Sequence, residues 1–181
     1  VYWFISEMCR TIGNKMPLLE YVKKLTPSHP ARALLSISDV APSRTRGSFY
    51  TSALTTLRLF TSKSIYAITH TSDFTLTDMG SKKQALFVIL PDEKTTFYPI
   101  ASLIVSQQYE LLAEAADRRG GRLERRVNFI LDEYGNFTPI SDMTNKLTVA
   151  AGRGMRYALF VQGFDQLKEK YSDNIANTIK G

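Results

Sequence analysis

The chain has 181 residues, 44% of them hydrophobic, so it can bury a sizeable core and holds one domain or two small ones. Its single cysteine, Cys9, excludes an internal disulfide and a thiolate metal cluster, and it favours a reducing compartment. His29 and His70 lack metal-ligand spacing. The formal charge of +6 is compatible with a polyanionic partner. No apolar run approaches the roughly 18 residues of a membrane span, and no signal peptide is apparent, which predicts a cytosolic chain.

The first 75 residues are predicted to be helical. Pro17 can open a helix, because a first turn does not need its missing N–H, and the segment around Pro27 breaks the pattern. A longer helix is predicted from about residue 45 to 60, with an aromatic and aliphatic face that is expected to lie in the core. Ser62 suits the N-cap of a short helix after it.

From residue 85 the pattern changes to alternating strands and helices. The short apolar run Leu86–Leu90 is followed by a proline and two acids, which predicts a buried strand, and Pro99 begins a helix with a broad apolar face. That face is predicted to contain Ile100, Leu103, Ile104, Leu111, Leu112 and Ala115. Residues 85–181 are therefore predicted to form an α/β region with a mainly parallel sheet.

Five arginines surround a pair of glycines before the next apolar run. With only two acids to offset them, they favour an exposed loop, and contact with a phosphate backbone is a secondary interpretation beside a solvated turn. The arginines are Arg118, Arg119, Arg122, Arg125 and Arg126.

The phrase VNFILDEYGN, from Val127 to Asn136, is an apolar run that ends on Asp132 and Glu133. Such a run suits a central strand covered on both faces, and parallel sheets place their ligands beyond the carboxyl ends of such strands. P-loop ATPases use this Walker B arrangement because the first acid holds Mg²⁺ and the following Glu polarises the attacking water. Alone, the pair favours the simpler interpretation of a solvated turn at a strand end.

A second apolar run, Tyr157–Val161, ends on Gln162. Apolar residues at helical spacing between 140 and 150 predict that a helix connects the two runs, which makes them parallel neighbours in one sheet. The Gln162 side chain is then expected to share a site with Asp132 and Glu133. A neutral amide there can contact a γ-phosphate oxygen or the attacking water.

Several phrases resemble those of the coupling proteins of type IV secretion and conjugation, the TraG/TraD-like ATPases. They are RTRGSFYTSALTTLRLF, QALFVILPDEKTTFYPIASLIVSQQYELLAEAA, VNFILDEYGN followed by FTPISDM, and GRGMRYALFVQGFDQLKEKY. The resemblance covers most of residues 44–181 and implies a RecA-like P-loop NTPase core at residues 76–181. Residues 1–75 would then contain part of an inserted all-α domain and the return to the core.

The resemblance also implies a function that uses ATP and Mg²⁺. The family consists of hexameric motors at the cytoplasmic face of the plasma membrane, which move single-stranded DNA and protein substrates to a type IV secretion channel. Relaxase or other secretion substrates and the channel proteins are the implied partners. The family's Gly-Arg pair after the Walker B helix corresponds here to Gly152 and Arg153, so Arg153 would reach the nucleotide of a neighbouring subunit, with Arg156 as a competitor.

One part of the family pattern is missing from this sequence. A P-loop needs a glycine followed by lysine, and no glycine here precedes a lysine. The chain is therefore expected to be an internal fragment without the Walker A loop and the membrane anchor, and to be inactive towards ATP by itself. The alternative is a non-catalytic helical docking module that binds relaxase or secretion substrates.

Overall fold

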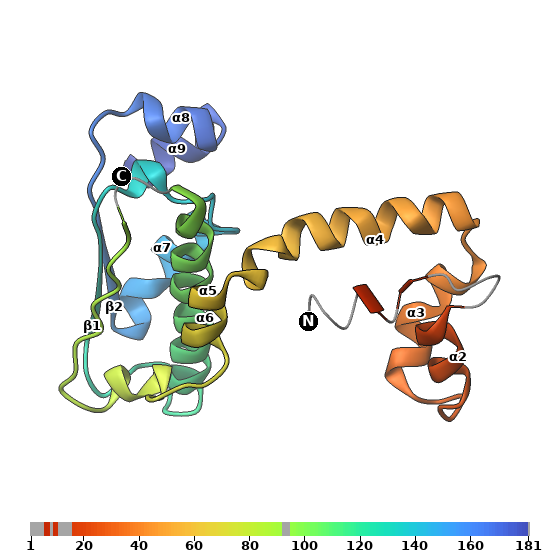
Figure 1. Ribbon diagram of the computed structural model, residues 1–181. Helices are drawn as coiled ribbons and strands as arrows, with labels where there is room; N and C mark the ends of the chain where they lie inside the picture. The colour runs from red at the N-terminus through yellow and green to blue at the C-terminus, as the bar shows by residue number, and fades with distance from the viewer. Residues whose placement is uncertain (1–5, 8, 11–15, 92–94, 181) are drawn as a thin grey trace. The chain divides into compact units, whose positions relative to one another are not determined.

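The structure is a computed structural model that describes residues 6–7, 9–10, 16–91 and 95–180, apart from the side chains of residues 37–39. The chain folds as two compact units, Val1–Ser72 and Asp73–Gly181. The first unit is helical in its described part, and the second combines helices with a two-stranded parallel sheet (Figure 1). The protein therefore has a mixed helix-and-strand architecture.

In the first unit a helix begins at Pro17, as the sequence predicts. Helices α2 (Pro17–Lys23) and α3 (Pro30–Val40) pack together, and the buried side chains of α2 join Cys9 in a small core. Burial raises the pKa of the Cys9 thiol, which disfavours the reactive thiolate. Helix α4 (Ser43–Leu57), the 3₁₀ turn η1 (Arg58–Thr61) and helix α5 (Lys63–Thr69) complete the unit.

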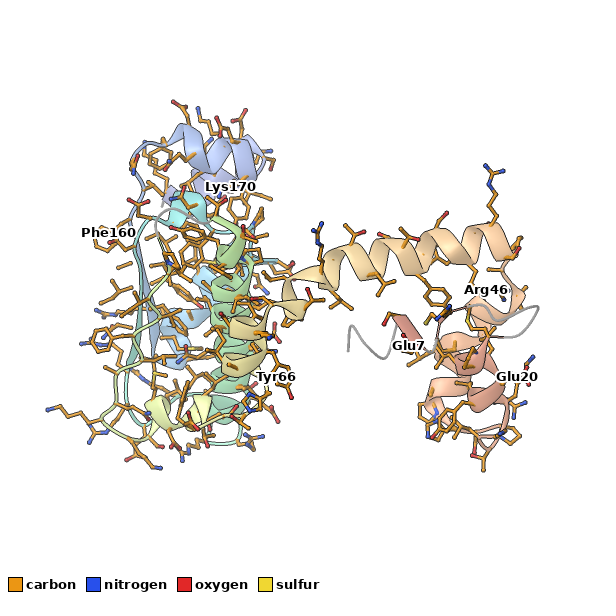
Figure 2. All side chains as sticks on the ribbon, viewed as in Figure 1. Glu7, Glu20, Arg46, Tyr66, Phe160 and Lys170 are labelled. Carbon is orange, nitrogen blue, oxygen red and sulfur yellow. The ribbon has the colours of Figure 1, made fainter. Side chains whose placement is uncertain are left out.

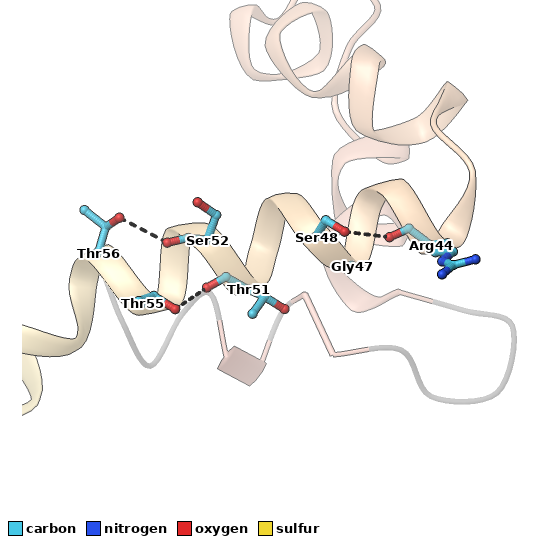
Figure 3. Close-up of a pocket in the computed structure, with 7 residues that line it drawn as sticks. All are labelled: Arg44, Gly47, Ser48, Thr51, Ser52, Thr55 and Thr56. Atoms are coloured by element: carbon cyan, nitrogen blue, oxygen red, sulfur yellow. Dashed lines mark hydrogen bonds between the residues drawn. The ribbon is translucent and has the colours of Figure 1, made fainter.

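Helix α4 corrects the expectation of a core-facing helix at 45–60. None of its residues is buried, and Phe49 is 49% exposed. Three of its hydroxyls donate to helix carbonyls one turn back: Ser48 to Arg44, Thr55 to Thr51 and Thr56 to Ser52, at 2.9–3.3 Å (Figure 3). Because these hydroxyls donate to carbonyls of their own helix, few hydroxyl donors in the polar hollow along α4 remain free to bind another group.

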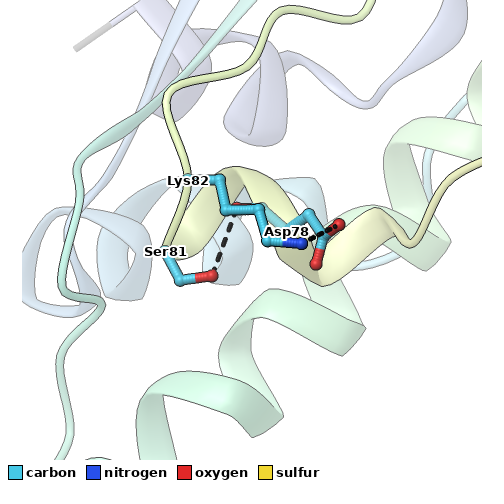
Figure 4. A network of polar contacts seen from close by, with 3 residues as sticks. All are labelled: Asp78, Ser81 and Lys82. Carbon is cyan, nitrogen blue, oxygen red and sulfur yellow. Dashed lines mark hydrogen bonds and ion pairs between the residues drawn. The ribbon is translucent and has the colours of Figure 1, made fainter.

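The second unit opens with the 3₁₀ turn η2 (Leu76–Gly80), which packs against the long helix α6 (Tyr98–Asp117). Asp78 closes the turn: its carboxylate pairs with Lys82 at 2.9 Å, and its carbonyl accepts from the Ser81 hydroxyl at 3.3 Å (Figure 4). A Cβ at Gly80 would lie 2.8 Å from a Leu123 methyl group, so only glycine allows this close approach. A short 3₁₀ turn η3 (Thr95–Phe97) precedes α6.

The sheet consists of β1 (Val127–Leu131) and β2 (Met155–Leu159), which run parallel in the register Val127↔Met155 to Leu131↔Leu159. Helix α7 (Met143–Arg153) is the crossover between them, as predicted, and the 3₁₀ turn η4 (Tyr134–Asn136) follows β1. The prediction of β2 at Tyr157–Val161 is displaced by two residues. Gly154, with φ 86°, ends α7 in a left-handed cap, so the strand begins directly after it.

Helices α8 (Asp165–Lys170) and α9 (Asp173–Lys180) follow the sheet and pack on each other, and α9 also contacts α7. The core of the unit lies between α6, α7 and one face of the sheet, where Leu112, Ala116 and Met155 have no exposed surface. None of the helices in the described ranges is long and apolar enough to span a bilayer.

Strand β1 is covered on one face only, which corrects the prediction of a strand buried on both faces. Val127, Phe129 and Leu131 are buried, whereas Ile130 between them is 71% exposed. The alternation follows from the period of two along a strand, because every second side chain points away from the helices.

The predicted strand at Leu86–Leu90 is wrong. These residues have no regular secondary structure, and Phe87 and Ile89 are 83% and 90% exposed. The segment runs alongside β1 (Figure 1), but no backbone hydrogen bond joins the two within the described part of the chain. A β-strand is defined by its backbone hydrogen bonds to a neighbouring strand, so an apolar run without these bonds is not a strand.

Candidate functional site

The carboxyl ends of β1 and β2 lie side by side, and the chain stays paired beyond them. Phe160 N donates to Leu131 O at 3.0 Å, and Tyr134 N donates back to Phe160 O at 2.8 Å. These two bonds carry the pairing past the ends of the strands. They therefore place the turn with Asp132 and Glu133 beside Gln162, the residues that the sequence assigned to one site.

Glu133 has a left-handed backbone, with φ 49° and ψ 40°, which is uncommon for a residue with a side chain. Its carboxylate accepts two amide hydrogen bonds. Gln162 Nε2 donates to Oε1 at 3.2 Å, and Asn136 Nδ2 donates to Oε2 at 2.7 Å. Because an ionised carboxylate only accepts, the NH₂ group of each amide must face it.

Asp132 lies at the solvent-exposed edge of the same turn. Its Oδ1 accepts from the backbone N–H of Glu133 at 3.0 Å, so one oxygen shapes the turn and the other is available. Mg²⁺ in nucleotide sites is held by one or two carboxylates together with phosphate oxygens. The donor set at this edge fits that requirement, although no cluster of three His, Cys, Asp or Glu side chains occurs among the described residues.

Gln166 on α8 contacts both sides of the site. Its Oε1 accepts from the backbone N–H of Gln162 at 3.2 Å, and its amide lies directly against Gly135. A Cβ at Gly135 would overlap that amide oxygen, so a larger residue there would displace the Gln166 side chain. The contact links the turn after β1 to the helix after β2.

A buried pair of tyrosines fixes the same turn from inside the core. The Tyr134 and Tyr171 hydroxyls are hydrogen-bonded at 2.8 Å, and Tyr171 also accepts from the backbone N–H of Ile140 at 2.9 Å. Burial raises the pKa of Tyr134, and the Tyr171 hydrogen bond adds to that effect. Tyr134 therefore stays neutral, and the hydrogen bonds of Tyr171 hold the segment 134–140 against the connection between α8 and α9.

Lys170 adds a second link between α8 and the turn after β1. Its ammonium donates to the Phe137 carbonyl at 2.5 Å, and burial lowers its pKa. Phe160, at the end of the pairing, instead projects outward and is 54% exposed (Figure 2). The turn that carries the acids is thus anchored on its inner side and open to solvent on its outer side.

A groove of about 670 Å³ runs along β1 and ends at Asp132 and Glu133. Its walls come from residues 84–90, from α6 and from β1. The sequence pattern does not indicate this groove, because the groove depends on the segment 84–90 standing apart from β1 rather than pairing with it.

Arg153 lies at the other end of the sheet, where α7 stops and β2 begins. Its guanidinium pairs with the Asp117 carboxylate at 3.1 Å. The five residues of each strand span four steps of about 3.3 Å, which separates this position from the acids by about 13 Å or more. Arg153 and its competitor Arg156, which is exposed on β2, are therefore not brought to Glu133 within this chain.

The arginine-rich loop occupies this same amino-terminal end of β1. Gly120 and Gly121 have φ angles of 79° and 96°, a backbone that favours glycine. Arg118 pairs with Glu114, and Arg119 lies 3.8 Å from Glu124. Two of the five arginines of this loop are thus balanced by neighbouring acids, as the solvated-turn interpretation expects.

Asn136 is the site residue that the sequence analysis did not identify. It follows the acids by three positions, and its side chain makes the shorter of the two amide contacts with Glu133. The available signal was the Gly-Asn pair after the strand, because these residues are typical of tight turns and a tight turn brings the asparagine back to the acid.

A family model described as "Type IV secretory system Conjugative DNA transfer" matches residues 4–181. The chain belongs to this family. Two curated relatives are conjugal transfer proteins TraG from Escherichia coli, both 26% identical, over 136 and 152 residues that cover 71% and 79% of this chain. Protein VirD4 from Rhizobium radiobacter is 27% identical over 118 residues, or 65% of this chain. No solved structure matches the chain.

The matched regions are only a part of each relative. They cover 21% and 24% of the two TraG proteins and 17% of VirD4, so the chain spans about a quarter or less of the length of these relatives. The resemblance to type IV coupling proteins that the sequence phrases indicated is thereby confirmed at the level of the family.

Proposed function

We propose that this chain supplies the Walker B half of a RecA-like ATPase that drives conjugative DNA transfer. The observation that carries the proposal is the junction of Asp132 and Glu133, at the end of β1, with Gln162, at the end of β2, where Gln162 donates to Glu133 at 3.2 Å. Family membership supports the role in DNA transfer. A pair of acids with a neutral amide across a parallel crossover supports the chemistry.

Each residue of the junction has a distinct task in this proposal. Asp132, through its free oxygen, binds the Mg²⁺ that accompanies ATP. Glu133 holds the attacking water and takes its proton on a carboxylate oxygen. Gln162 orients that water or a γ-phosphate oxygen, and α8 follows its movement through Gln166. Bound ATP supplies the phosphoryl group and the phosphate oxygens that complete the metal site.

The proposed partners are single-stranded DNA, relaxase or other secretion substrates, and the proteins of a type IV secretion channel. We propose a homohexamer that works at the cytoplasmic face of the plasma membrane. Arg153 would serve the nucleotide of a neighbouring subunit, since it lies at the end of the sheet away from its own acids and is 28% exposed. A guanidinium supplied in this way couples hydrolysis around a ring.

The test is Glu133→Gln in the full-length protein. The amide keeps the shape of the side chain but cannot accept a proton, so we expect Mg-ATP binding to persist while kcat falls by roughly 10²- to 10⁴-fold. Glu20→Gln is the matched control, because Glu20 is an exposed glutamate on α2, in the other compact unit. Parent-level turnover by a folded, assembled Glu133→Gln protein would overturn the proposal.

A further inference from the structure

We propose that Asn136 is a positioning residue, which holds the Glu133 carboxylate in place for proton transfer while Gln162 turns to the phosphate. The inference rests on the proposed function. It starts from the two oxygens of Glu133, each of which has its own amide donor: Oε2 has Asn136 at 2.7 Å, and Oε1 has Gln162 at 3.2 Å.

The two donors differ in where they come from. Asn136 belongs to the same turn as Glu133, and its backbone N–H also donates to the Glu133 carbonyl at 2.8 Å. The turn is held from inside by Tyr134 and Tyr171. Asn136 therefore stays beside Glu133 whatever the rest of the site does. Gln162 comes from the next strand and reaches Glu133 across 29 positions of sequence.

The two donors also differ in what else they must do. In the proposed reaction Gln162 contacts the water or the γ-phosphate as well as Glu133, so its NH₂ group divides its two hydrogens between these acceptors. The 3.2 Å contact is the longer and weaker one, which suits a bond that breaks in each cycle. Asn136 has no such second task, so it remains the donor that fixes the carboxylate.

Glu133 needs such a donor because its side chain is exposed. An exposed glutamate moves among several rotamers, and only some of them direct an oxygen at the attacking water. A catalytic group must be held close to its productive geometry, and a neighbouring side chain is what holds it. The Asn136 hydrogen bond fixes the end of the Glu133 side chain.

The decisive comparison is Asn136→Asp with Asn136→Ala in the full-length protein. Aspartate has the same shape as asparagine but places a negative oxygen against the Glu133 carboxylate, and this repulsion turns the glutamate away. Alanine only removes the donor. We expect kcat to fall about 10-fold for Asn136→Ala and about 100-fold for Asn136→Asp, the range seen for supporting residues, with the KM for Mg-ATP unchanged in both.

A purely structural role predicts the opposite order, because the isosteric aspartate would then be the milder change. Asn136→Gln keeps the amide on a longer side chain and should restore most of the rate that Asn136→Ala loses. If the Asn136→Asp protein fails to assemble, the kcat values of the Asn136→Ala and Asn136→Gln proteins test the inference by themselves. Asn145→Asp and Asn145→Ala are the controls, because Asn145 is an exposed asparagine on α7.

The outcomes separate this inference from the proposed function. If Glu133→Gln abolishes turnover but Asn136→Asp is no worse than Asn136→Ala, or if glutamine does not rescue, then Asn136 does not position the glutamate and only the inference fails. If Glu133→Gln turns over at the parent rate, the proposed function fails first. A change in KM with kcat unchanged would also overturn the inference.

Discussion

The two ends of the small sheet carry opposite chemistry. At the carboxyl end, two acids meet amide donors, and their oxygens are open to solvent next to a groove. At the amino end, arginines are paired with acids of α6 and its following loop, as Arg153 is with Asp117. One end therefore holds acceptors ready for a cation and a water, whereas the other end holds cations that must leave an existing salt bridge before they act elsewhere.

The largest effect that would test this separation is expected for Arg153→Ala. If Arg153 acts on the nucleotide of a neighbour, its loss should lower kcat by about 10³-fold or more in assembled rings, as for other arginine fingers. Turnover should be measured together with assembly. Arg118→Ala is the control, since Arg118 forms an exposed pair with Glu114 nearby.

Rings that contain two different variant subunits test the same prediction more specifically. Combining Arg153→Ala subunits with Glu133→Gln subunits should recover part of the activity, because some interfaces then contain an intact glutamate and an intact arginine. An equal loss from Arg153→Ala in unassembled and assembled protein would place the arginine in its own subunit's site, and the two ends would not be separate.

A smaller effect, on stability, is expected for Tyr171→Phe at the carboxyl end. The change removes one bond to Tyr134 and one to Ile140, each of which typically contributes about 0.5–1.5 kcal/mol, so the free energy of unfolding should fall by about 1–3 kcal/mol. Chemical denaturation measures this. Tyr66→Phe is the control, because Tyr66 is 64% exposed and stacks on His70. Equal stabilities for the two variants would show that the tyrosine pair does not hold the turn.

The sequence predicted the parts of this site that depend on local pattern. An apolar run ending on Asp132 and Glu133 is a strand that ends on two acids, and a helical spacing after it is the crossover α7. The contact between Gln162 and Glu133 follows from these two facts, because a parallel crossover must place the strand ends together.

The predictions that were wrong concern segments whose structure depends on residues far away in the sequence. Leu86–Leu90 has the composition of a strand, but it lacks backbone bonds to β1 in the described residues. In α6, Leu103 and Leu111 were placed on the buried face yet are 48% and 39% exposed, whereas Ala116 is buried. Which side of an apolar helix is covered is decided by the elements around it, and spacing alone does not show them.

The central claim is that the ends of β1 and β2 form one hydrolytic unit, and a double-mutant cycle in the full-length protein tests it most directly. ATP turnover is measured for the parent, Glu133→Gln, Gln162→Ala and the double variant. Residues that act together are not additive, so we predict that Gln162→Ala slows the parent but causes no further loss in the Glu133→Gln protein. If the two fold-losses multiply instead, Glu133 and Gln162 act independently and the account of a single site is contradicted.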